Sequence, residues 1–257
     1  MVGGIPLKID QSFIIQSFEH AVHSYREATH QVGLWESEKY VFTKYFSKED
    51  KILDIGCGTG RTTFGLYELG YKHLVGLDLS PHMTHEALRI RDQFGMNIDF
   101  IQGDATELSY DDDSFDHALF SFNGIMQIPK NENRVQALKE IHRVLKTNGH
   151  FIFTTHDRNA EDAFKEFWIE EKRRWEEGNH DQRLYEFGDR LITTSEKERD
   201  IYIHIPDIQE VIETLQSAPF TIVEQFYRSD LFDEPEPVKR FSTDCMFWVV
   251  KKNLDKC

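Results

Sequence analysis

Three glycines at alternate positions follow a short apolar run in the segment KILDIGCGTGR, residues 51–61. They are Gly56, Gly58 and Gly60. Glycine directly after a buried strand lets backbone N–H groups come close to a ligand, because no Cβ blocks the approach. An ordinary tight turn uses the same residue type, so this loop alone leaves ligand binding and a plain turn equally open.

The spacing of the glycines argues against two phosphate-binding patterns. A dinucleotide fingerprint, G-x-G-x-x-G, needs glycine at position 61, where this chain has Arg61. A phosphate loop ends in Gly-Lys-Ser or Gly-Lys-Thr, and the sequence contains neither. The loop therefore suits a ligand without a pyrophosphate group.

Two carboxylates follow the next two apolar runs. Asp78 closes VGLD, and Asp104 follows the run that ends in QG. An acid at the end of the second strand accepts hydrogen bonds from ribose hydroxyls in dinucleotide folds. An acid after the third strand is placed to accept one from an adenine amine, so an adenosine without phosphates fits all three features. The alternative for Asp78, a helix N-cap, is better served by Ser80 before Pro81.

These side chains need a sheet whose strands alternate with helices. Apolar runs predict strands at 51–55, 73–78, 97–102, 116–121, 149–155, 220–227 and 244–251. Helical spacing predicts helices near 60–70, 81–94, 131–146 and 206–217. Parallel strands need crossovers, so the alternation predicts a doubly wound α/β fold with a mostly parallel, seven-stranded, Rossmann-like sheet. The last two strands are expected to form an antiparallel pair at its edge.

Two further regions are expected to flank this core. Apolar residues at helical spacing in 11–46 predict two or three N-terminal helices, broken near Gly33. After Thr155 the alternation gives way to a charged helix at 160–177 and a hairpin within 184–205. We therefore divide a single domain, 1–257, into N-terminal helices (1–50), a cofactor-binding core (51–156), an inserted substrate cap (157–205) and a C-terminal helix with edge strands (206–257).

Aromatic residues are concentrated in these flanking regions. The spacing of Phe164, Trp168 and Trp175 makes a stripe on one helix face, which favours simple packing. Phe18 and Tyr25 also fit helix packing, with a lid over the ligand as the alternative.

Taken in order, the motifs resemble those of class I S-adenosylmethionine-dependent methyltransferases. LDIGCGTGR, GLDLSPHM and IQGDATEL are similar to the first three motifs of the family, and DDSFDHALFSFNGIM to the fourth. ALKEIHRVLKTNGHFIFTT is similar to the helix and strand that follow, so the resemblance runs from about residue 50 to 155. Thr147, Asn148 and Gly149 replace the family's usual Pro-Gly-Gly. Because Asn tolerates the left-handed conformation, we expect the turn to be kept.

The resemblance implies S-adenosylmethionine as the cofactor and a set of residues that bind it. These are Asp54, Gly56, Cys57, Gly58, Asp78, Leu79, Met83, Asp104, Ala105, Phe120, Ser121 and Phe122. Asp54 and the two glycines would face the methionyl part, and Asp78 the ribose hydroxyls. The pairs 79/83 and 104/105 would contact the adenine, and 120–122 would border the sulfonium. For Met83, plain core packing is the alternative.

The chemistry itself demands few residues. Methyl transfer from a sulfonium is an in-line displacement, in which the protein mainly aligns the reacting atoms and excludes water. A base is needed only when the acceptor must lose a proton. His156, just past the fifth strand, is the candidate base because histidine titrates near neutrality. A loop histidine bonded to the backbone is the alternative. His156 and Asp157 lack further ligands at metal-binding spacing, so we expect no metal.

Composition limits the partners. The 257 residues carry 30 lysines and arginines against 45 acids, a formal charge of −15, which disfavours nucleic acid and anionic membrane surfaces. Cys57, Cys245 and Cys257 are too scattered for a disulfide framework or zinc site. No secretory signal or membrane span is evident, so a cytoplasmic location is expected.

The sequence thus predicts methyl transfer to an oxygen or nitrogen of a small-molecule acceptor. A protein methyltransferase and a non-catalytic S-adenosylmethionine-binding protein are the alternatives. Aminopropyl transfer from the same cofactor is a third, for which acid-rich YDDDSFD is the only hint, and a surface turn explains that segment more simply. The exposed faces predict no oligomeric state.

Overall fold

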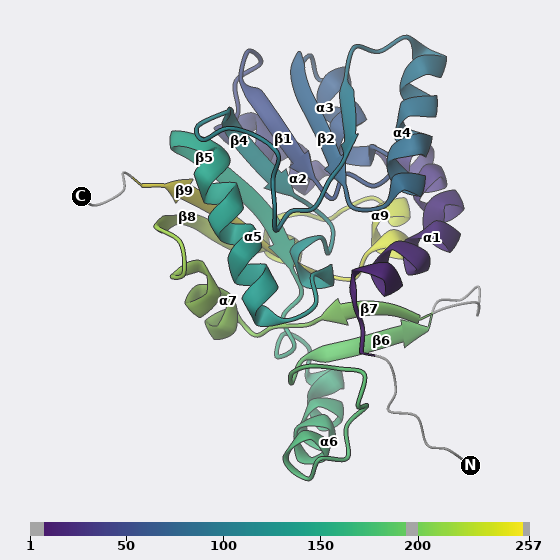
Figure 1. The fold of residues 1–257 in the computed structure, drawn as a ribbon, viewed down its shortest axis with the longest axis vertical. Coiled ribbons are helices and arrows are strands. Elements are labelled where there is room, and N and C mark those ends of the chain that lie inside the picture. Colours follow the sequence, from purple (N-terminus) through teal and green to yellow (C-terminus); the bar gives the residue numbers. More distant parts are fainter. Residues whose placement is uncertain (1–7, 194–199, 254–257) are drawn as a thin grey trace.

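A seven-stranded sheet forms the centre of the computed structural model, which describes residues 8–193 and 200–253 (Figure 1). The strand order is β3-β2-β1-β4-β5-β9-β8. The strands are β1 (Lys51–Ile55), β2 (His73–Asp78), β3 (Asp99–Gln102), β4 (Phe115–Phe120), β5 (Leu145–Thr155), β8 (Phe220–Tyr227) and β9 (Met246–Lys252). β9 pairs antiparallel with both β5 and β8, and the other pairs are parallel. This confirms the predicted mostly parallel sheet with an antiparallel pair at its edge, where β8 is outermost.

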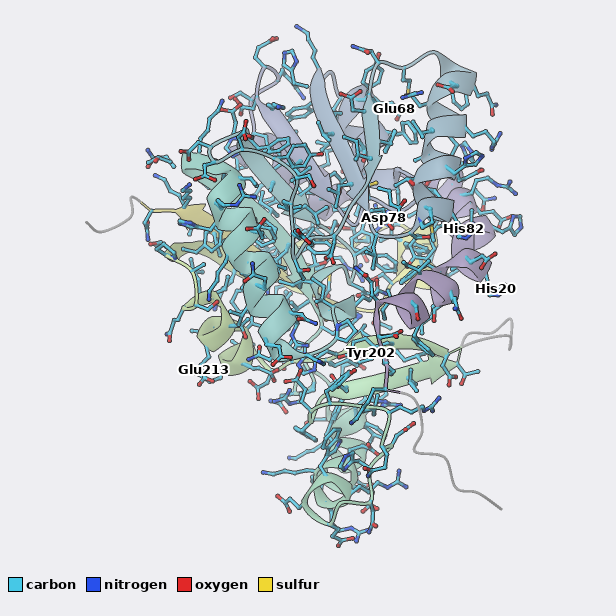
Figure 2. All side chains as sticks on the ribbon, viewed as in Figure 1. His20, Glu68, Asp78, His82, Tyr202 and Glu213 are labelled. Carbon is cyan, nitrogen blue, oxygen red and sulfur yellow. The ribbon has the colours of Figure 1, made fainter. Side chains whose placement is uncertain are left out.

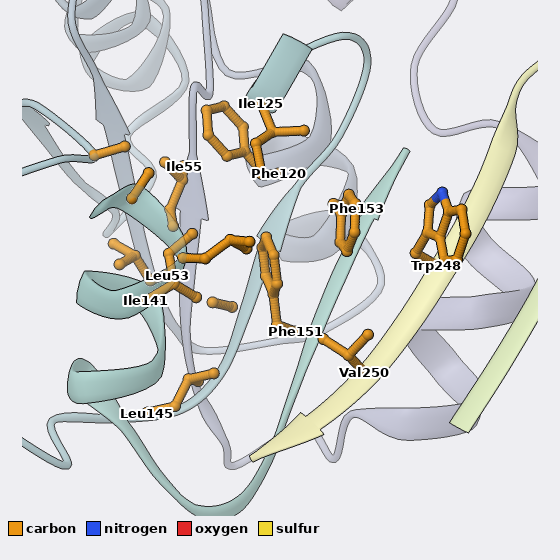
Figure 3. Close-up of a cluster of buried hydrophobic side chains, with 14 of the residues drawn as sticks. Leu53, Ile55, Phe120, Ile125, Ile141, Leu145, Phe151, Phe153, Trp248 and Val250 are labelled. Carbon is orange, nitrogen blue, oxygen red and sulfur yellow. The ribbon is translucent and has the colours of Figure 1, made fainter. Parts of the chain in front are cut away.

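Helices cover both faces of the sheet. One face carries α5 (Asn131–Val144) and α7 (Ile208–Leu215), and the other α2 (Glu36–Tyr45), α3 (Arg61–Glu68), α4 (Pro81–Phe94) and α9 (Glu236–Phe241). Successive strand residues point to opposite faces: Leu53 packs on the α5 side and Ile52 on the α3 side. Figure 3 shows Leu53, Phe151 and Trp248 within the first of these cores. Burial on both faces explains why the strands are continuous apolar runs.

Local sequence signals account for the helix ends. Ser80 caps α4 by accepting a hydrogen bond from the Met83 N–H, with Pro81 at the first helical position. Gly95 ends α4 in the left-handed conformation, at φ 63°. The helix therefore occupies the predicted 81–94, and the predicted capping role of Ser80 is confirmed.

β5 begins at Leu145, four residues before the predicted start at 149. The extension arises because Leu145 already pairs with Phe115, before a register shift in the ladder between Phe115 and His117. The expected turn is kept within this extension, since Asn148 has a φ of 68°. The first part of β5 thus accommodates the unusual Thr-Asn-Gly sequence without interrupting the strand.

Two regions lie outside the layers. α1 (Gln11–Gln31) crosses the carboxyl ends of the strands, and Gly33, at φ 61°, separates it from α2. The segment after β5 holds α6 (Lys165–Glu176) and a hairpin of β6 (Asp189–Thr193) and β7 (Asp200–His204), whose tip at 194–199 lies outside the described residues, as does Cys257. In Figure 1, α6 projects below this hairpin, away from the sheet.

α1 and the segment after β5 meet each other. Ile9 and Ile14 share a buried cluster with Leu184 and Tyr202, to which Leu79 also contributes.

Among the described helices, none is both long and apolar enough to span a membrane. The acid-rich residues 111–113 lie in a surface turn before β4, as predicted, and Asp112 pairs there with Arg143.

Candidate active site

A cavity opens beyond the carboxyl ends of β1, β2 and β4, with about 700 Å³ of empty space when its mouth is included. We call it the strand-end cavity. Most residues predicted to bind the cofactor line it, namely Gly56, Gly58, Asp78, Leu79, Met83, Asp104, Ala105, Phe120 and Phe122. Parallel strands place their carboxyl ends at one sheet edge, so residues far apart in sequence converge here.

The glycine loop is shaped by neighbouring rings as well as by the open space. Gly56 and Gly58 both have left-handed backbones, at φ 61° and 56°. A Cβ on Gly56 would collide with the Phe120 ring, and one on Gly58 would lie 3.3 Å from Cδ1 of Tyr25. The Phe120 ring of β4 therefore excludes a side chain at Gly56, while at Gly58 the left-handed backbone and the nearby Tyr25 ring of α1 disfavour one.

Asp78 lies at the end of β2, beside α1 (Figure 2). Its two carboxylate oxygens accept hydrogen bonds from the backbone N–H groups of Gly58 and Ser80, both at 2.8 Å. Burial raises the pKa of Asp78 to about 6, although these two bonds favour the charged form. The carboxylate therefore ties the glycine loop to β2 in addition to facing the cavity.

α1 closes over the cavity from above Asp104. The Gln11 side chain donates a hydrogen bond to Oδ2 of Asp104 at 2.7 Å, while Oδ1 accepts one from the Thr106 N–H. Phe18 and Tyr25 of the same helix line the cavity, and their rings meet edge to face at 5.9 Å. The aromatic residues of α1 thus form a cover over this site.

Asp54, Cys57 and Ser121 also belong to the predicted set, but they do not line the cavity. Asp54 is buried, and its carboxylate accepts hydrogen bonds from Thr62 and Thr63. Burial raises its pKa to about 7. Cys57 packs in the core beside α3. The predicted contact of these three residues with the cofactor stays a prediction.

Ser121 belongs to a buried ionic network behind the cavity. Its hydroxyl donates to Glu38, and Arg61 forms two hydrogen bonds with the same carboxylate, at 2.6 and 2.7 Å. Glu38 also accepts a hydrogen bond from the Trp35 N–H, and it is fully buried. Arg61, which breaks the dinucleotide pattern, thus joins the end of the glycine loop to α2.

Sequence reasoning missed part of the lining. Gln127 and Ile128, after the fourth strand, contact the cavity, as do Ile14 and Ile15 of α1. Neither segment has a glycine or acid at a strand end that would have marked it. The apolar stripe of α1 was visible in the sequence, but not the surface that it covers.

A second cavity lies between the sheet and the segment after β5, with about 1560 Å³ of empty space including its mouth. We call it the cap cavity. Its core wall includes His156, Asp157 and Tyr227, and its outer wall includes Phe167 and Trp168 of α6. The aromatic stripe predicted to pack against the domain thus faces this opening, and Trp175 alone joins the cluster shared with α1.

His156 lines the cap cavity and not the strand-end cavity. Its Nδ1 lies 2.9 Å from the carbonyl oxygen of Asp244. A carbonyl only accepts, so Nδ1 carries the proton and Nε2 of the neutral ring is the basic nitrogen. Burial, assisted by Arg228, lowers the pKa of His156, although the Asp244 carbonyl favours the charged form. The ring is therefore neutral at pH 7, and no described residue donates a hydrogen bond to Nε2.

Three consecutive residues separate the two cavities. Phe122 and Gly124 line the strand-end cavity, and Asn123 between them lines the cap cavity. Phe122 and Asn123 both have left-handed backbones, at φ 47° and 66°, which is unusual for a bulky residue such as Phe. Stacking on Phe241, with ring centroids 4.5 Å apart, holds the Phe122 ring in place. This strained turn thus borders both cavities.

Ionic contacts join the cap to the core. His204 of β7 lies between Asp189 at 2.8 Å and Glu210 of α7 at 2.5 Å. Burial opposes the charged ring, but these carboxylates outweigh it and raise the pKa of His204. Glu186, Asp189 and His204 place ligand atoms within 4.8 Å of one another, yet Arg134 already pairs with Glu186. These groups satisfy one another as ion pairs.

Comparisons with known proteins agree with this geometry. Residues 52–149 match the family model of a methyltransferase domain. Over 128 residues the chain is 35% identical to a demethylmenaquinone methyltransferase of Staphylococcus epidermidis, covering 49% of this chain and 51% of that one. It is 26% identical over 114 residues to an eEF1A lysine and N-terminal methyltransferase homolog of Drosophila melanogaster, covering 42% and 17%. The chain thus spans at most about half the length of these relatives.

The fold comparison covers more of the chain. A crystal structure of a SAM-dependent methyltransferase from Methanosarcina mazei matches with a TM-score of 0.68 at 21% identity, covering 87% of this chain and 100% of that one. The architecture is therefore the Rossmann-like methyltransferase fold. Within it, residues 52–149 are the part that matches the family model of a methyltransferase domain.

Proposed function

We propose that this protein transfers the methyl group of S-adenosylmethionine to an oxygen or nitrogen atom of a small molecule held in the cap cavity. The observation that carries the proposal is the Phe122–Gly124 turn, whose consecutive residues line the two cavities in alternation. A donor in the strand-end cavity and an acceptor in the cap cavity would meet across this turn.

The donor fits the residues of the strand-end cavity. The Asp78 carboxylate is the group that would hold the ribose hydroxyls, and Asp104 lies where an adenine amine would reach it once Gln11 gives way. Apolar side chains such as Leu79 and Met83 would flank the adenine. S-adenosylmethionine supplies an activated methyl group on its sulfonium when bound.

The acceptor side needs a proton acceptor when the nucleophile carries hydrogen. The methyl–sulfur bond breaks as the new bond to oxygen or nitrogen forms, and the electron pair stays on sulfur. The acceptor's proton would pass to Nε2 of His156, whose tautomer the Asp244 carbonyl fixes. The cap cavity is open at its mouth, and its aromatic wall of Phe167 and Trp168 would shield the reacting atoms from water once the acceptor fills it.

A labelling experiment tests the proposal. The protein is incubated with methyl-labelled S-adenosylmethionine and either a protein-free metabolite extract or a protein extract stripped of small molecules. We expect label in a small molecule from the first mixture. Label only in protein would support a protein acceptor instead. Binding of the donor without any label transfer would indicate a non-catalytic binding protein.

A matched variant checks that the strand-end cavity supplies the methyl group. Asp78→Asn should lose most labelling at limiting donor, whereas Asp92→Asn, on the exposed end of α4, should not. Equal labelling by both variants would place the donor elsewhere.

A further inference from the structure

One cation of the cap cavity stands apart from the other charged groups. Arg190 of β6 lines the cavity, and its guanidinium lies 4.1 Å from the centroid of the Phe167 ring and 5.9 Å from that of Trp168. Among the described residues, none accepts a hydrogen bond from it. The N–H groups of the guanidinium are therefore free to donate hydrogen bonds to a ligand.

The other arginine of the same cavity is already occupied. Arg158 forms ion pairs with Asp207 and Glu210, both at 2.7 Å. These contacts join the cap to α7 and neutralise that guanidinium. Arg190 differs because its nearest interactions are with rings, and Glu171 acts on it only as a nearby charge.

The carboxylates of the cavity are held by other partners or face solvent. Asp157 accepts a hydrogen bond from the Tyr227 hydroxyl at 2.6 Å, and Asp244 accepts two from Ser229. Glu161 and Asp230 are exposed. The two bonded acids come from the core wall, next to His156, whereas Arg190 comes from the hairpin of the cap. The cavity thus has an acidic core wall and an unpaired guanidinium on its cap wall.

Burial makes this guanidinium a strong recognition element. Arg190 is half-buried, and desolvation lowers its pKa although the charge of Glu171 opposes this shift. A planar guanidinium matches a carboxylate through two parallel hydrogen bonds, and the match is worth more in a partly enclosed site than at the surface. The apolar side chains beside it, Phe167, Ile192 and Ile203, would contact a hydrocarbon or aromatic body.

We propose that the methyl acceptor is an organic acid, a molecule whose carboxylate binds Arg190 and whose apolar or aromatic body lies along α6. This proposal rests on the proposed function, because it names the substrate class of the same reaction. The carboxylate end anchors at the cap wall. The nucleophilic oxygen or nitrogen at the other end of the molecule then lies toward His156 and the Phe122–Gly124 turn.

The labelled extract described above provides the first test. The labelled product should be retained by an anion exchanger at about pH 11, where an amine nitrogen no longer cancels the charge of the carboxylate. Arg190→Gln should lower kcat/KM for the acceptor that gives this product by about tenfold or more, because the charge-assisted pair is lost. Arg190→Lys should keep part of the activity, and Arg173→Gln, whose exposed side chain pairs with Glu170 and Glu177, should match the parent. A neutral or cationic labelled product, or an acidic one made equally well by Arg190→Gln, would overturn the proposal.

A binding measurement keeps the test independent of turnover. The probes are 3-phenylpropanoate and its uncharged amide, 3-phenylpropanamide, titrated into protein saturated with S-adenosylhomocysteine. The parent should bind the carboxylate about tenfold more tightly than the amide, and Arg190→Gln should bind both equally. Equal affinities for the parent, or a preference that survives in Arg190→Gln, would refute the anion site. A preference that depends on Arg190 without any label transfer would refute the proposed function alone.

Melting temperatures of the variants show whether a loss of binding arises from a loss of folding. Arg190→Gln loses its contact with the Phe167 ring, so a modest decrease is expected. Arg190→Lys keeps the positive charge beside the ring. Loss of the carboxylate preference in a variant that melts like the parent assigns the effect to recognition rather than folding.

Discussion

The strand-end cavity and the cap cavity differ in what builds them. The strand-end cavity is built largely from residues at strand ends or in the short segments after them, including Gly56, Asp78 and Asp104. The cap cavity takes its walls from residue 123, from 156–168, from residues 190, 192, 203 and 205 of the cap hairpin, and from 227–245.

The two cavities also differ in how many of their polar groups are bonded within the protein. In the strand-end cavity, Asp78 is bonded to two backbone N–H groups, and a Cβ on Gly56 would meet Phe120. In the cap cavity, Arg190 and Nε2 of His156 have no hydrogen-bonding partner among the described residues. The lining of the strand-end cavity is held in place by bonds within the protein. The cap cavity offers polar groups that a ligand can bind, so its lining would determine which acceptor is methylated.

The buried ion pair behind the strand-end cavity should give the largest effect on stability. Glu38→Ala leaves the guanidinium of Arg61 buried without its carboxylate, so the free energy of unfolding should fall by about 3–5 kcal/mol. Glu36→Ala, on the exposed side of the same helix, should change it by less than about 0.5 kcal/mol. Denaturant unfolding measures both. Equal stabilities would mean that the cavity does not depend on this network.

Loss of the candidate base should affect turnover more than folding. His156→Ala should lower kcat by about a hundredfold, because proton transfer to a positioned base is lost, while cofactor affinity stays close to that of the parent. His82→Ala, on the exposed face of α4, is the matched control. In the parent, the acidic limb of the pH–rate profile should lie below the usual histidine pKa, since burial lowers the pKa of His156. A stability loss with unchanged turnover per folded molecule would make His156 a structural residue.

Asp78→Ala should weaken S-adenosylmethionine binding by about 2–3 kcal/mol, from loss of charge-assisted bonds to the ribose. It should also lower stability, because the N–H groups of Gly58 and Ser80 lose their acceptor. These two backbone bonds give the carboxylate a structural role in addition to its predicted role toward the ribose. Calorimetry and thermal unfolding separate the two effects, and undiminished binding in a less stable variant would make Asp78 purely structural.

A smaller effect is expected in the pH dependence of cofactor binding, and its direction follows from the pKa of Asp78. Because the pKa of Asp78 is raised to about 6, cofactor affinity should fall by about tenfold between pH 7 and pH 5, as the carboxylate gains a proton. Stability should move the opposite way. A raised carboxyl pKa means that the folded state binds the proton more tightly, so the contribution of Asp78 to stability decreases as pH rises from about 4 to 6. Comparing the parent with Asp78→Asn isolates both changes, and parallel pH profiles would refute the assignment.

Much of the fold could be predicted from the sequence because its signals are local. Short-range chemistry accounts for the apolar run before the glycines, the Ser80-Pro81 start of α4, the acid that ends β2 and the acid that follows β3. The start of β5 could not be predicted in the same way. It depends on the pairing of Leu145 with Phe115, a contact made only when the sheet forms.

The candidate site could be predicted where its residues lie at strand ends, and not where tertiary contacts orient the side chains. Residues at strand ends, such as Gly58 and Asp78, converge because the topology brings them together. Asp54 and Ser121 lie in the same motifs, yet Thr62 and Glu38 hold their side chains behind the cavity. Side-chain direction there depends on tertiary partners that no motif encodes. The cap cavity depends on such partners almost entirely.

A crystal structure with S-adenosylhomocysteine bound tests the central claim most directly. We predict the adenosine in the strand-end cavity, the ribose hydroxyls on Asp78, and the sulfur at the Phe122–Gly124 turn with its open side toward the cap cavity. A ligand bound in this cavity with its sulfur turned away from the cap, or bound elsewhere on the protein, would contradict the account.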